Sequence, residues 1–274
     1  MKLLSDPKVN YKIKKNLKKG YYTYSLALAQ SDISGYNVCP MANRLPMGEN
    51  VSKKSTCSSV CVGYNGFAQR FPSVMEARVK KTKMFYENRG EFLSILEKEI
   101  IKGVNKAEKL GFKPSFRLNA YSDIRWENYG IIQKFSDVTF YDYTKLPNRS
   151  KPGNYQLTYS HYGDYEYTMK ALSNDMNVAM VFDEIPKEYY GFEVLNGDET
   201  DIRIDERDSN GNSCIIGLKF KGSKKELEQG IKDRFVVKAW EPIICEGKQG
   251  KLKAIKSSSI RLEGHLQNDV CSKS

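Results

Sequence analysis

The chain has 274 residues and a formal net charge of +11, with 40% hydrophobic and 28% charged residues. This balance excludes an intrinsically disordered chain, and the length is sufficient for one large folded domain. No run approaches the roughly 20 apolar residues that cross a bilayer, and the polar N-terminus lacks a secretory apolar region, so we expect a cytoplasmic protein without membrane contact.

The first predicted elements are a strand, a long loop and two helices. Residues 21–29 predict a strand because they are rich in aromatic and β-forming residues. The loop 31–71 is long and carries three of the six cysteines, which favours a functional role. Pro72 occupies the first turn of a predicted helix, and residues 91–110 predict a second helix from apolar residues at three-and-four spacing, followed by Gly111.

The middle of the chain alternates between predicted strands and helices. This rhythm predicts right-handed βαβ crossovers and a largely parallel sheet of about seven strands. A complete or partial TIM-type barrel fits best, and an open doubly wound sheet is the alternative. The predicted strands are residues 115–120, 138–143, 155–160, 177–182, 191–194 and 214–220, and the predicted helices are residues 126–135, 165–172 and, in short form, 186–190.

Outside this alternation the chain has two basic ends. We predict a basic N-terminal arm at residues 1–20, a single α/β domain at 21–245 and an extended basic tail at 246–274. Lysine-rich ends can neutralise phosphates and would give salt-sensitive binding of nucleic acid. A solubilising surface is the alternative.

Polar groups follow four of the predicted strands, where parallel α/β sheets bind their ligands. Each single residue has a structural alternative; Asp123, for example, could cap the helix that begins near Trp126. Because four strand ends converge, we predict a polar pocket with proton-transfer groups. The predicted catalytic residues are Asp123, Asp142, Lys145 and His161.

An acidic run at residues 196–203 contributes further candidates. Its carboxylates could hold a divalent cation or a ribose, although a surface turn with a weak Asp201–Arg203 ion pair is the alternative. Basic and amide groups near the strand ends would bind phosphate. The predicted substrate- or phosphate-binding residues are Arg117, Asn119, Asp198, Asp201 and Arg203.

The cysteine-bearing loop is the sharpest local feature. Cys39, Cys57 and Cys61 could hold an iron–sulfur cluster with an open iron, or a zinc ion whose fourth position is taken by water, substrate or His161. Their spacing matches neither zinc-ribbon, ferredoxin nor radical-SAM patterns. Free buried thiols are the alternative.

Several motifs along the chain are specific in combination. They are residues 34–42, Cys57-x-x-x-Cys61, residues 77–85, 116–119, 122–127, 140–145, 154–160 and 197–203. Together they resemble the Gene product 88-like family of bacteriophages. The resemblance implies a phage or mobile-element origin, hence the host cytoplasm, and supplies no reaction. A longer insert between Cys39 and Cys57, and Ala120-Tyr121 in place of a Gly-Thr pair, depart from the family pattern.

From these features we predict a metal- or iron–sulfur-dependent enzyme that acts on a nucleotide or nucleic acid at the carboxyl rim of the sheet. A non-catalytic phage DNA- or RNA-binding accessory protein is the main alternative, since tyrosines interleaved with lysines can stack on unpaired bases. An inhibitor of a host factor is a third possibility.

Overall fold

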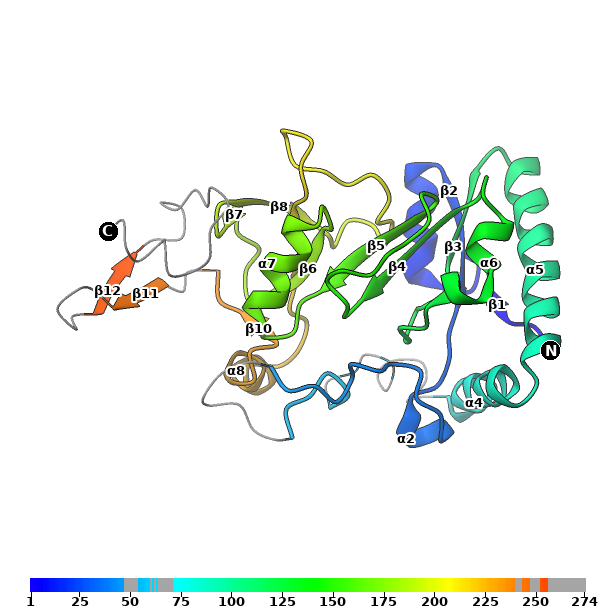
Figure 1. The fold of residues 1–274 in the computed structure, drawn as a ribbon, viewed down its shortest axis with the longest axis horizontal. Coiled ribbons are helices and arrows are strands. Elements are labelled where there is room, and N and C mark those ends of the chain that lie inside the picture. Colours follow the sequence, from blue (N-terminus) through cyan, green and yellow to red (C-terminus); the bar gives the residue numbers. More distant parts are fainter. Residues whose placement is uncertain are drawn as a thin grey trace. The chain divides into compact units, whose positions relative to one another are not determined.

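The computed structural model describes residues 1–46, 54–59, 61, 63, 71–239, 243–246 and 252–255. These residues form two compact units (Figure 1). Unit 1 comprises residues 1–45, the described part of 52–160, and 199–205. Unit 2 comprises residue 46, residues 161–198 and the described residues from 206 onward. Among the described residues, no helix is both long and apolar enough to span a bilayer.

Unit 1 contains five strands that lie side by side in chain order. The last four are mutually parallel, and the short first strand runs antiparallel to the second. The predicted strands of this part of the chain are therefore confirmed. They are β1 (Leu4–Ser5), β2 (Tyr21–Leu26), β3 (Lys113–Arg117), β4 (Thr139–Thr144) and β5 (Tyr155–Ser160).

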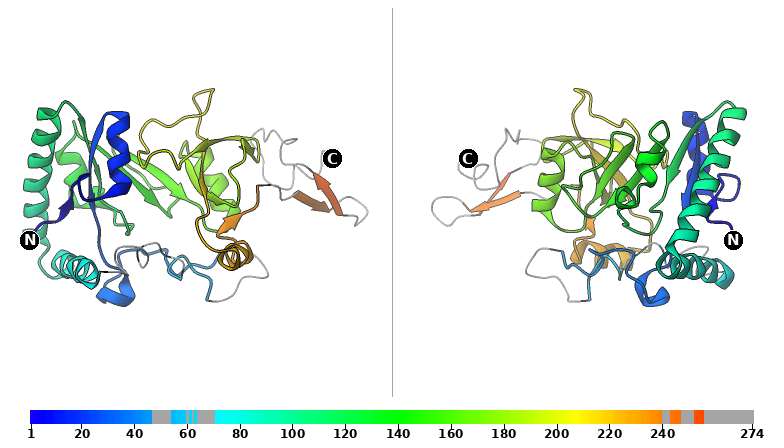
Figure 2. Two further views of the ribbon diagram at one scale, coloured as in Figure 1. Left: turned by 180° about the vertical axis from the view of Figure 1, so that it is seen from behind. Right: turned by 45° about the vertical axis from the view of Figure 1, so that its right-hand side comes forward.

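The long helix α5 (Arg89–Lys109) covers one face of this sheet. Its apolar stripe is buried, as the spacing predicts, and Gly111 after it adopts a positive φ of 75°. At Gly103 an added Cβ would lie 2.9 Å from the Tyr24 ring and 3.1 Å from Phe116, so only glycine lets the helix approach β2 and β3 this closely. The preceding helix α4 (Pro72–Glu87) runs in a clearly different direction (Figure 2).

One predicted helix of unit 1 is divided into two shorter elements in the structure. We predicted a continuous helix at residues 126–135, but a 3-10 turn, η3 (Trp126–Tyr129), and α6 (Ile131–Lys134) are separated by Gly130, whose φ is 73°. Left-handed backbone at that position ends the first turn. The remaining short elements are α1 (Tyr11–Lys14), η1 (Lys15–Lys19) and α2 (Ser31–Ser34).

The sheet face opposite α5 is lined by polar and aromatic side chains, and we call it the polar face. It is covered by residues of the first twenty and by the segment 199–205. Asn16 Nδ2 donates to Thr23 Oγ1 and to Tyr141 OH, both at 2.9 Å, and Asn16 Oδ1 accepts from the Asp201 N–H at 3.1 Å. The residues before β2 thus pack onto the sheet. The polar face comprises Thr23, Ser25, Ser115, Arg117, Tyr141 and Tyr143.

Unit 2 has a second set of five strands. Their order is β6-β9-β8-β7, with β10 parallel to β6 on its other side. Residues 186–190 were predicted as helical, which is wrong, because residues 188–189 form a strand antiparallel to β8. The strands are β6 (Val178–Phe182), β7 (Glu188–Tyr189), β8 (Phe192–Asn196), β9 (Ile215–Lys219) and β10 (Val236–Val237).

Two helices complete unit 2. The predicted helix at residues 165–172 is confirmed as α7 (Tyr165–Ser173). Helix α8 (Lys224–Lys232) escaped prediction because it carries few apolar residues, although its Ser223/Glu226 capping box is a readable start signal. A hairpin of β11 (Ile243–Glu246) and β12 (Leu252–Ile255) includes part of the predicted extended tail.

The prediction of an α/β protein with a largely parallel sheet is confirmed. The strands do not close into a barrel, because the run in unit 1 ends at the antiparallel edge strand β1 and the run in unit 2 ends at the antiparallel edge strand β7.

Candidate functional site

The loop after β3 is held together by one buried side chain, that of Asn119. Its Oδ1 accepts hydrogen bonds from Ser122 Oγ at 2.7 Å, the Ile124 N–H at 3.0 Å and Trp126 Nε1 at 3.1 Å. Its Nδ2 donates to the Ile124 carbonyl at 2.9 Å and to Tyr155 OH at 3.3 Å. The side-chain oxygen and nitrogen of Asn119, a predicted ligand-binding residue, are therefore both engaged in hydrogen bonds within the protein.

Asp142 lies beside this loop on the α5 side of β4 and is completely buried. Its two oxygens accept from the Asn119 N–H at 2.7 Å and from Tyr155 OH at 2.8 Å. Burial raises the pKa of Asp142 to about 7, although the two hydrogen bonds and the charges of Arg117 and Arg149 oppose the shift. A carboxyl group with a near-neutral pKa therefore lies near the carboxyl ends of the parallel strands of unit 1, and we call this edge of the sheet the rim.

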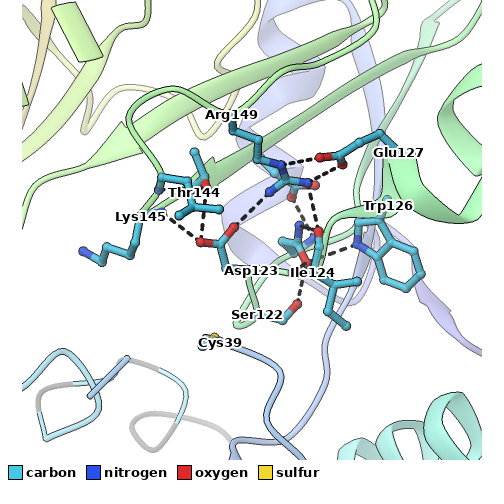
Figure 3. A network of polar contacts seen from close by, with 12 residues as sticks. Cys39, Ser122, Asp123, Ile124, Trp126, Glu127, Thr144, Lys145 and Arg149 are labelled. Carbon is cyan, nitrogen blue, oxygen red and sulfur yellow. Dashed lines mark hydrogen bonds and ion pairs between the residues drawn. The ribbon is translucent and has the colours of Figure 1, made fainter. Parts of the chain in front are cut away.

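Asp123 forms a buried ion pair at the same rim (Figure 3). Its Oδ1 lies 2.9 Å from Arg149 Nη1, while Oδ2 accepts from Thr144 Oγ1 at 3.1 Å and from the Lys145 N–H at 2.9 Å. The same guanidinium binds Glu127 through two hydrogen bonds, at 2.8 and 2.6 Å. One buried cation therefore joins two carboxylates from different parts of the loop after β3.

These contacts settle what the side chain of Asp123 does locally. It does not cap the turn that begins at Trp126, because the capping position is Arg125 and makes no side-chain cap hydrogen bond. Burial raises the pKa of Asp123, against the opposing hydrogen bond from Lys145 and the charge of Arg149. Asp123 is instead a bridge between the loop after β3 and the end of β4.

Lys145 extends from the end of β4 toward the end of β5. Its Nζ donates to the Ser160 carbonyl at 2.7 Å and to Ser160 Oγ at 2.9 Å. Burial lowers the pKa of Lys145, and the neighbouring Cys57, Asp123 and Cys39 oppose that shift. The ammonium group of a predicted catalytic lysine is thus within electrostatic reach of two predicted metal-binding cysteines.

Cys39 is attached directly to this rim. The Asp123 N–H donates to the Val38 carbonyl at 2.8 Å, and Cys39 Sγ donates to the Tyr121 carbonyl at 3.7 Å. The Tyr121 ring is covered by the guanidinium of Arg78, 4.3 Å from its centroid. The start of the predicted loop is therefore fixed to the residues that follow β3.

Two short contacts bring the second part of the cysteine-bearing loop to the first. The Ser58 N–H donates to the Ala42 carbonyl at 2.9 Å, and Ser58 Oγ donates to Asn43 Oδ1 at 2.9 Å. Gln30 Nε2 donates to Cys61 Sγ at 3.4 Å. Cys57 and Cys61 are free thiols of intermediate exposure, as is Cys39.

The Cys39 thiol lies close enough to the other two cysteines to be affected by their charge. The pKa of Cys39 is raised, first by burial and then by the charges of Asp123, Cys57 and Cys61. Among the residues that the structure describes, however, no group of three or more His, Cys, Asp or Glu side chains is arranged to hold a metal ion. The thiols are neighbours without forming a ready-made coordination shell.

The phosphate-binding candidates Arg117 and Asp201 lie on the polar face. Arg117 Nη1 lies 2.6 Å from Asp201 Oδ2, and its guanidinium stacks 4.9 Å above the Tyr143 ring. Arg203 Nε donates to Tyr143 OH at 2.8 Å. Asp201 thus has Arg117 as an ion-pair partner, which differs from the expected pairing with its neighbour Arg203.

The last two candidates, His161 and Asp198, belong to unit 2. His161 Nε2 accepts from the Gly163 N–H at 3.1 Å, and its Nδ1 lies 2.6 Å from Thr168 Oγ1. Both ring nitrogens therefore have hydrogen-bond partners within unit 2. Asp198 forms an exposed ion pair with Lys221 at 3.0 Å.

An open groove of about 600 Å³ adjoins the ion-pair network of Asp123. Arg149 and Glu127 are among its lining residues, although the Arg149 side chain is only 1% exposed and its guanidinium is engaged by Asp123 and Glu127. Sequence reasoning missed this groove because its residues are polar and belong to several short turns. It is lined by Arg125, Glu127, Asn128, Gln133, Leu146, Asn148, Arg149, Ser150, Lys151 and Pro152.

Comparison with known proteins gives one informative result. The family model described as Gene product 88 matches residues 2–239, which includes nearly all of unit 1, unit 2 as far as residue 239 and every predicted site residue. Neither the curated proteins nor the solved structures contain a match to this chain.

Proposed function

The chain belongs to the Gene product 88 family, and we propose that it is an enzyme that depends on zinc or an iron–sulfur cluster. Its metal ligands are Cys39, Cys57 and Cys61, and its substrate is a nucleotide or nucleic acid. The reaction site lies at the carboxyl ends of the parallel strands of unit 1, in the manner of a partial TIM-type barrel.

The observation that carries this proposal is the grouping of three partly buried thiols, two of which, Cys39 and Cys57, act electrostatically on Lys145. Three thiolates around a divalent zinc ion, or around a cluster core of the same charge, carry a net negative charge that the Lys145 ammonium offsets. Metal binding displaces the thiol protons and so overcomes the raised pKa of Cys39. The hydrogen bonds of Cys39 Sγ and Cys61 Sγ are weak because sulfur is a weak donor and acceptor, so little is lost when these thiols move to ligand distance.

Within this site the side chains divide into reacting and positioning groups. Lys145 is the proton-transfer residue of the proposal, because burial brings its pKa toward the range in which general acids and bases work. Asp123 positions Lys145 through its backbone N–H, and Asp142 positions the loop after β3 through the Asn119 N–H.

The groove beside Arg149 supports the substrate class. Its volume of about 600 Å³ falls in the range of small-molecule sites. The charges of Arg149 and Glu127 are already paired with each other, so Arg125 and Lys151 give the groove wall an excess of positive charge. Cationic groups together with the amide side chains of this wall are suited to phosphate and base edges.

Anaerobic purification with elemental analysis tests the metal site. The wild-type protein should hold zinc, or iron with sulfide and a brown colour, and Cys57→Ala should lose it. Cys214→Ala is the matched control because Cys214 is a buried thiol of unit 2 that hydrogen-bonds Asn177. A wild-type protein that takes up neither zinc nor iron and sulfide would contradict the proposal.

Incubation with nucleotides and short single-stranded oligonucleotides, followed by mass spectrometry, tests the enzymatic part. The metal-loaded protein should change the mass of a member of one of these classes. Lys145→Met should slow the change by about 100-fold or more while the metal content stays intact.

The same groove favours one second candidate, a non-catalytic nucleic-acid-binding protein. In that case oligonucleotide binding should weaken steeply with salt, Arg125→Gln and Lys151→Gln should reduce it, and no product should form. Exposed Lys134→Gln, which lies outside the groove wall, provides the control.

A further inference from the structure

A small cavity opens on the polar face at the carboxyl ends of β2 and β3. Its volume is about 40 Å³, close to the roughly 30 Å³ that one water molecule occupies in the liquid. It therefore admits a single small polar group and excludes a whole nucleotide. Its lining residues are Asn10, Lys12, Ile13, Ser25, Arg117, Ala120 and Tyr121.

The guanidinium of Arg117 contributes a buried donor to this cavity wall. Its Nη1 pairs with Asp201, but its buried Nε has no hydrogen-bond partner among the described residues. The side chain is only 12% exposed, so bulk water does not solvate it freely. A buried cationic N–H without an acceptor is rare in folded proteins, and a bound ligand is one of the few physical reasons for it.

The other polar walls of the cavity also favour an anion. Ser25 Oγ accepts from Asn10 Nδ2 at 3.3 Å, so the Ser25 hydroxyl hydrogen can still donate to a ligand. Lys12 adds a positive charge at the wall, and none of the lining residues is acidic. The charge of Asp201 is already engaged by Arg117, so Lys12 gives the cavity an excess of positive charge.

We propose that this cavity binds one oxyanion group, a carboxylate or a phosphate, through Arg117 Nε, the Ser25 hydroxyl and the Lys12 ammonium. Tyr121 lies between the cavity and the thiol of Cys39. Its carbonyl accepts from Cys39 Sγ, and the same residue lines the cavity. An anion held here anchors one end of a ligand whose other end reaches the cysteines. Its assignment to the substrate rests on the proposed function, whereas anion binding itself does not.

Titration with inorganic phosphate and with acetate, at constant ionic strength and with chloride as the reference anion, tests this proposal. The readout is the Nε–H resonance of Arg117 in ¹⁵N-arginine-labelled protein, assigned by its loss in Arg117→Lys. A saturable shift with phosphate identifies a phosphate site, and a saturable shift with acetate alone identifies a carboxylate site.

Lys12→Gln should weaken the binding about tenfold, and Ser25→Ala should also weaken it, without loss of folding. Lys18→Gln is the matched control, since Lys18 is exposed on η1 outside the cavity wall and its loss should leave the affinity unchanged.

A resonance that neither anion shifts would show a water-filled cavity and overturn the proposal. An equal loss of affinity in Lys12→Gln and Lys18→Gln would also overturn it, because binding would then reflect overall charge. Metal content distinguishes the two proposals: a metal-loaded protein without anion binding refutes only the cavity, and an anion-binding protein without metal refutes only the metal site.

Discussion

Two neighbouring regions of unit 1 contain predicted site residues, and they differ in how fully their polar atoms are used. The carboxylate network comprises Asn119, Asp123, Glu127, Asp142, Arg149 and Tyr155, and its charged groups are paired or hydrogen-bonded at 2.6–3.3 Å. The cysteine segment comprises the described residues between 37 and 63, whose sulfur atoms have contacts of 3.4–3.7 Å.

This difference indicates which residues stabilise the structure and which residues are available to bind a ligand. A satisfied buried network stabilises one arrangement of the chain and has few atoms left for a ligand. Partly exposed thiols with weak contacts remain able to bind a metal, which displaces their protons. In the enzyme that we propose, the carboxylate network therefore positions the site, and the cysteine segment acts with Lys145 in the reaction.

Removing the central cation of the carboxylate network should have the largest effect on stability. Arg149→Met leaves the carboxylates of Asp123 and Glu127 buried without their partner, which should cost about 3–5 kcal/mol in denaturant unfolding. Arg207→Met removes the exposed ion pair with Asp175 and should cost less than about 1 kcal/mol. Equal losses in the two variants would place the carboxylate network among ordinary surface contacts.

The second effect is a pH dependence that belongs to Asp142. Its folded pKa, raised by burial to about 7 from 3.8, means that the folded state favours the neutral acid. The stability gained from the neutral form is fully present below pH 3.8 and is lost as the pH rises through about 7.

Asp142→Asn should therefore lose less stability than the wild type between pH 4 and pH 8, by on the order of 2–4 kcal/mol. The amide oxygen retains the hydrogen bond from the Asn119 N–H, whereas the bond to Tyr155 reverses, because the amide NH₂ donates where the carboxylate accepted from Tyr155 OH. If the free energies of unfolding of the two proteins change equally with pH across this range, the pKa of Asp142 is not raised in the folded state and the prediction is wrong.

The smallest effect on stability is expected in the cysteine segment. In metal-free protein, Cys57→Ala should change the free energy of unfolding by less than about 1 kcal/mol, because the half-exposed thiol packs little surface. In metal-loaded protein the same substitution should remove the extra stability that the metal supplies. A metal-free loss as large as that of Arg149→Met would identify Cys57 as part of the scaffold.

Part of this site follows from the sequence. Strand-end logic locates Asp123, Asp142 and Lys145 at one rim because parallel strands share the direction in which they end. Side chains also alternate between the two faces of a strand. In β4 this alternation puts Asp142 on one sheet face and Tyr141 and Tyr143 on the other, and it can be predicted from the sequence.

The long-range partners could not be predicted. Arg117 pairs with Asp201 from 84 residues away, and Arg149 reaches Asp123 and Glu127 across 26 and 22 residues. Such pairs depend on how the loops fold over the sheet, and the secondary-structure propensities of single residues contain no information about these contacts. The missed groove and the missed cavity have the same origin.

X-ray absorption at the metal edge of the loaded protein tests the central claim most directly. We predict sulfur neighbours at about 2.3 Å, the usual zinc–thiolate distance, with sulfur lost from the shell when Cys39 is replaced by serine. A first shell of only nitrogen and oxygen, unchanged in Cys39→Ser, Cys57→Ser and Cys61→Ser, would contradict the assignment of the cysteine segment as the metal site.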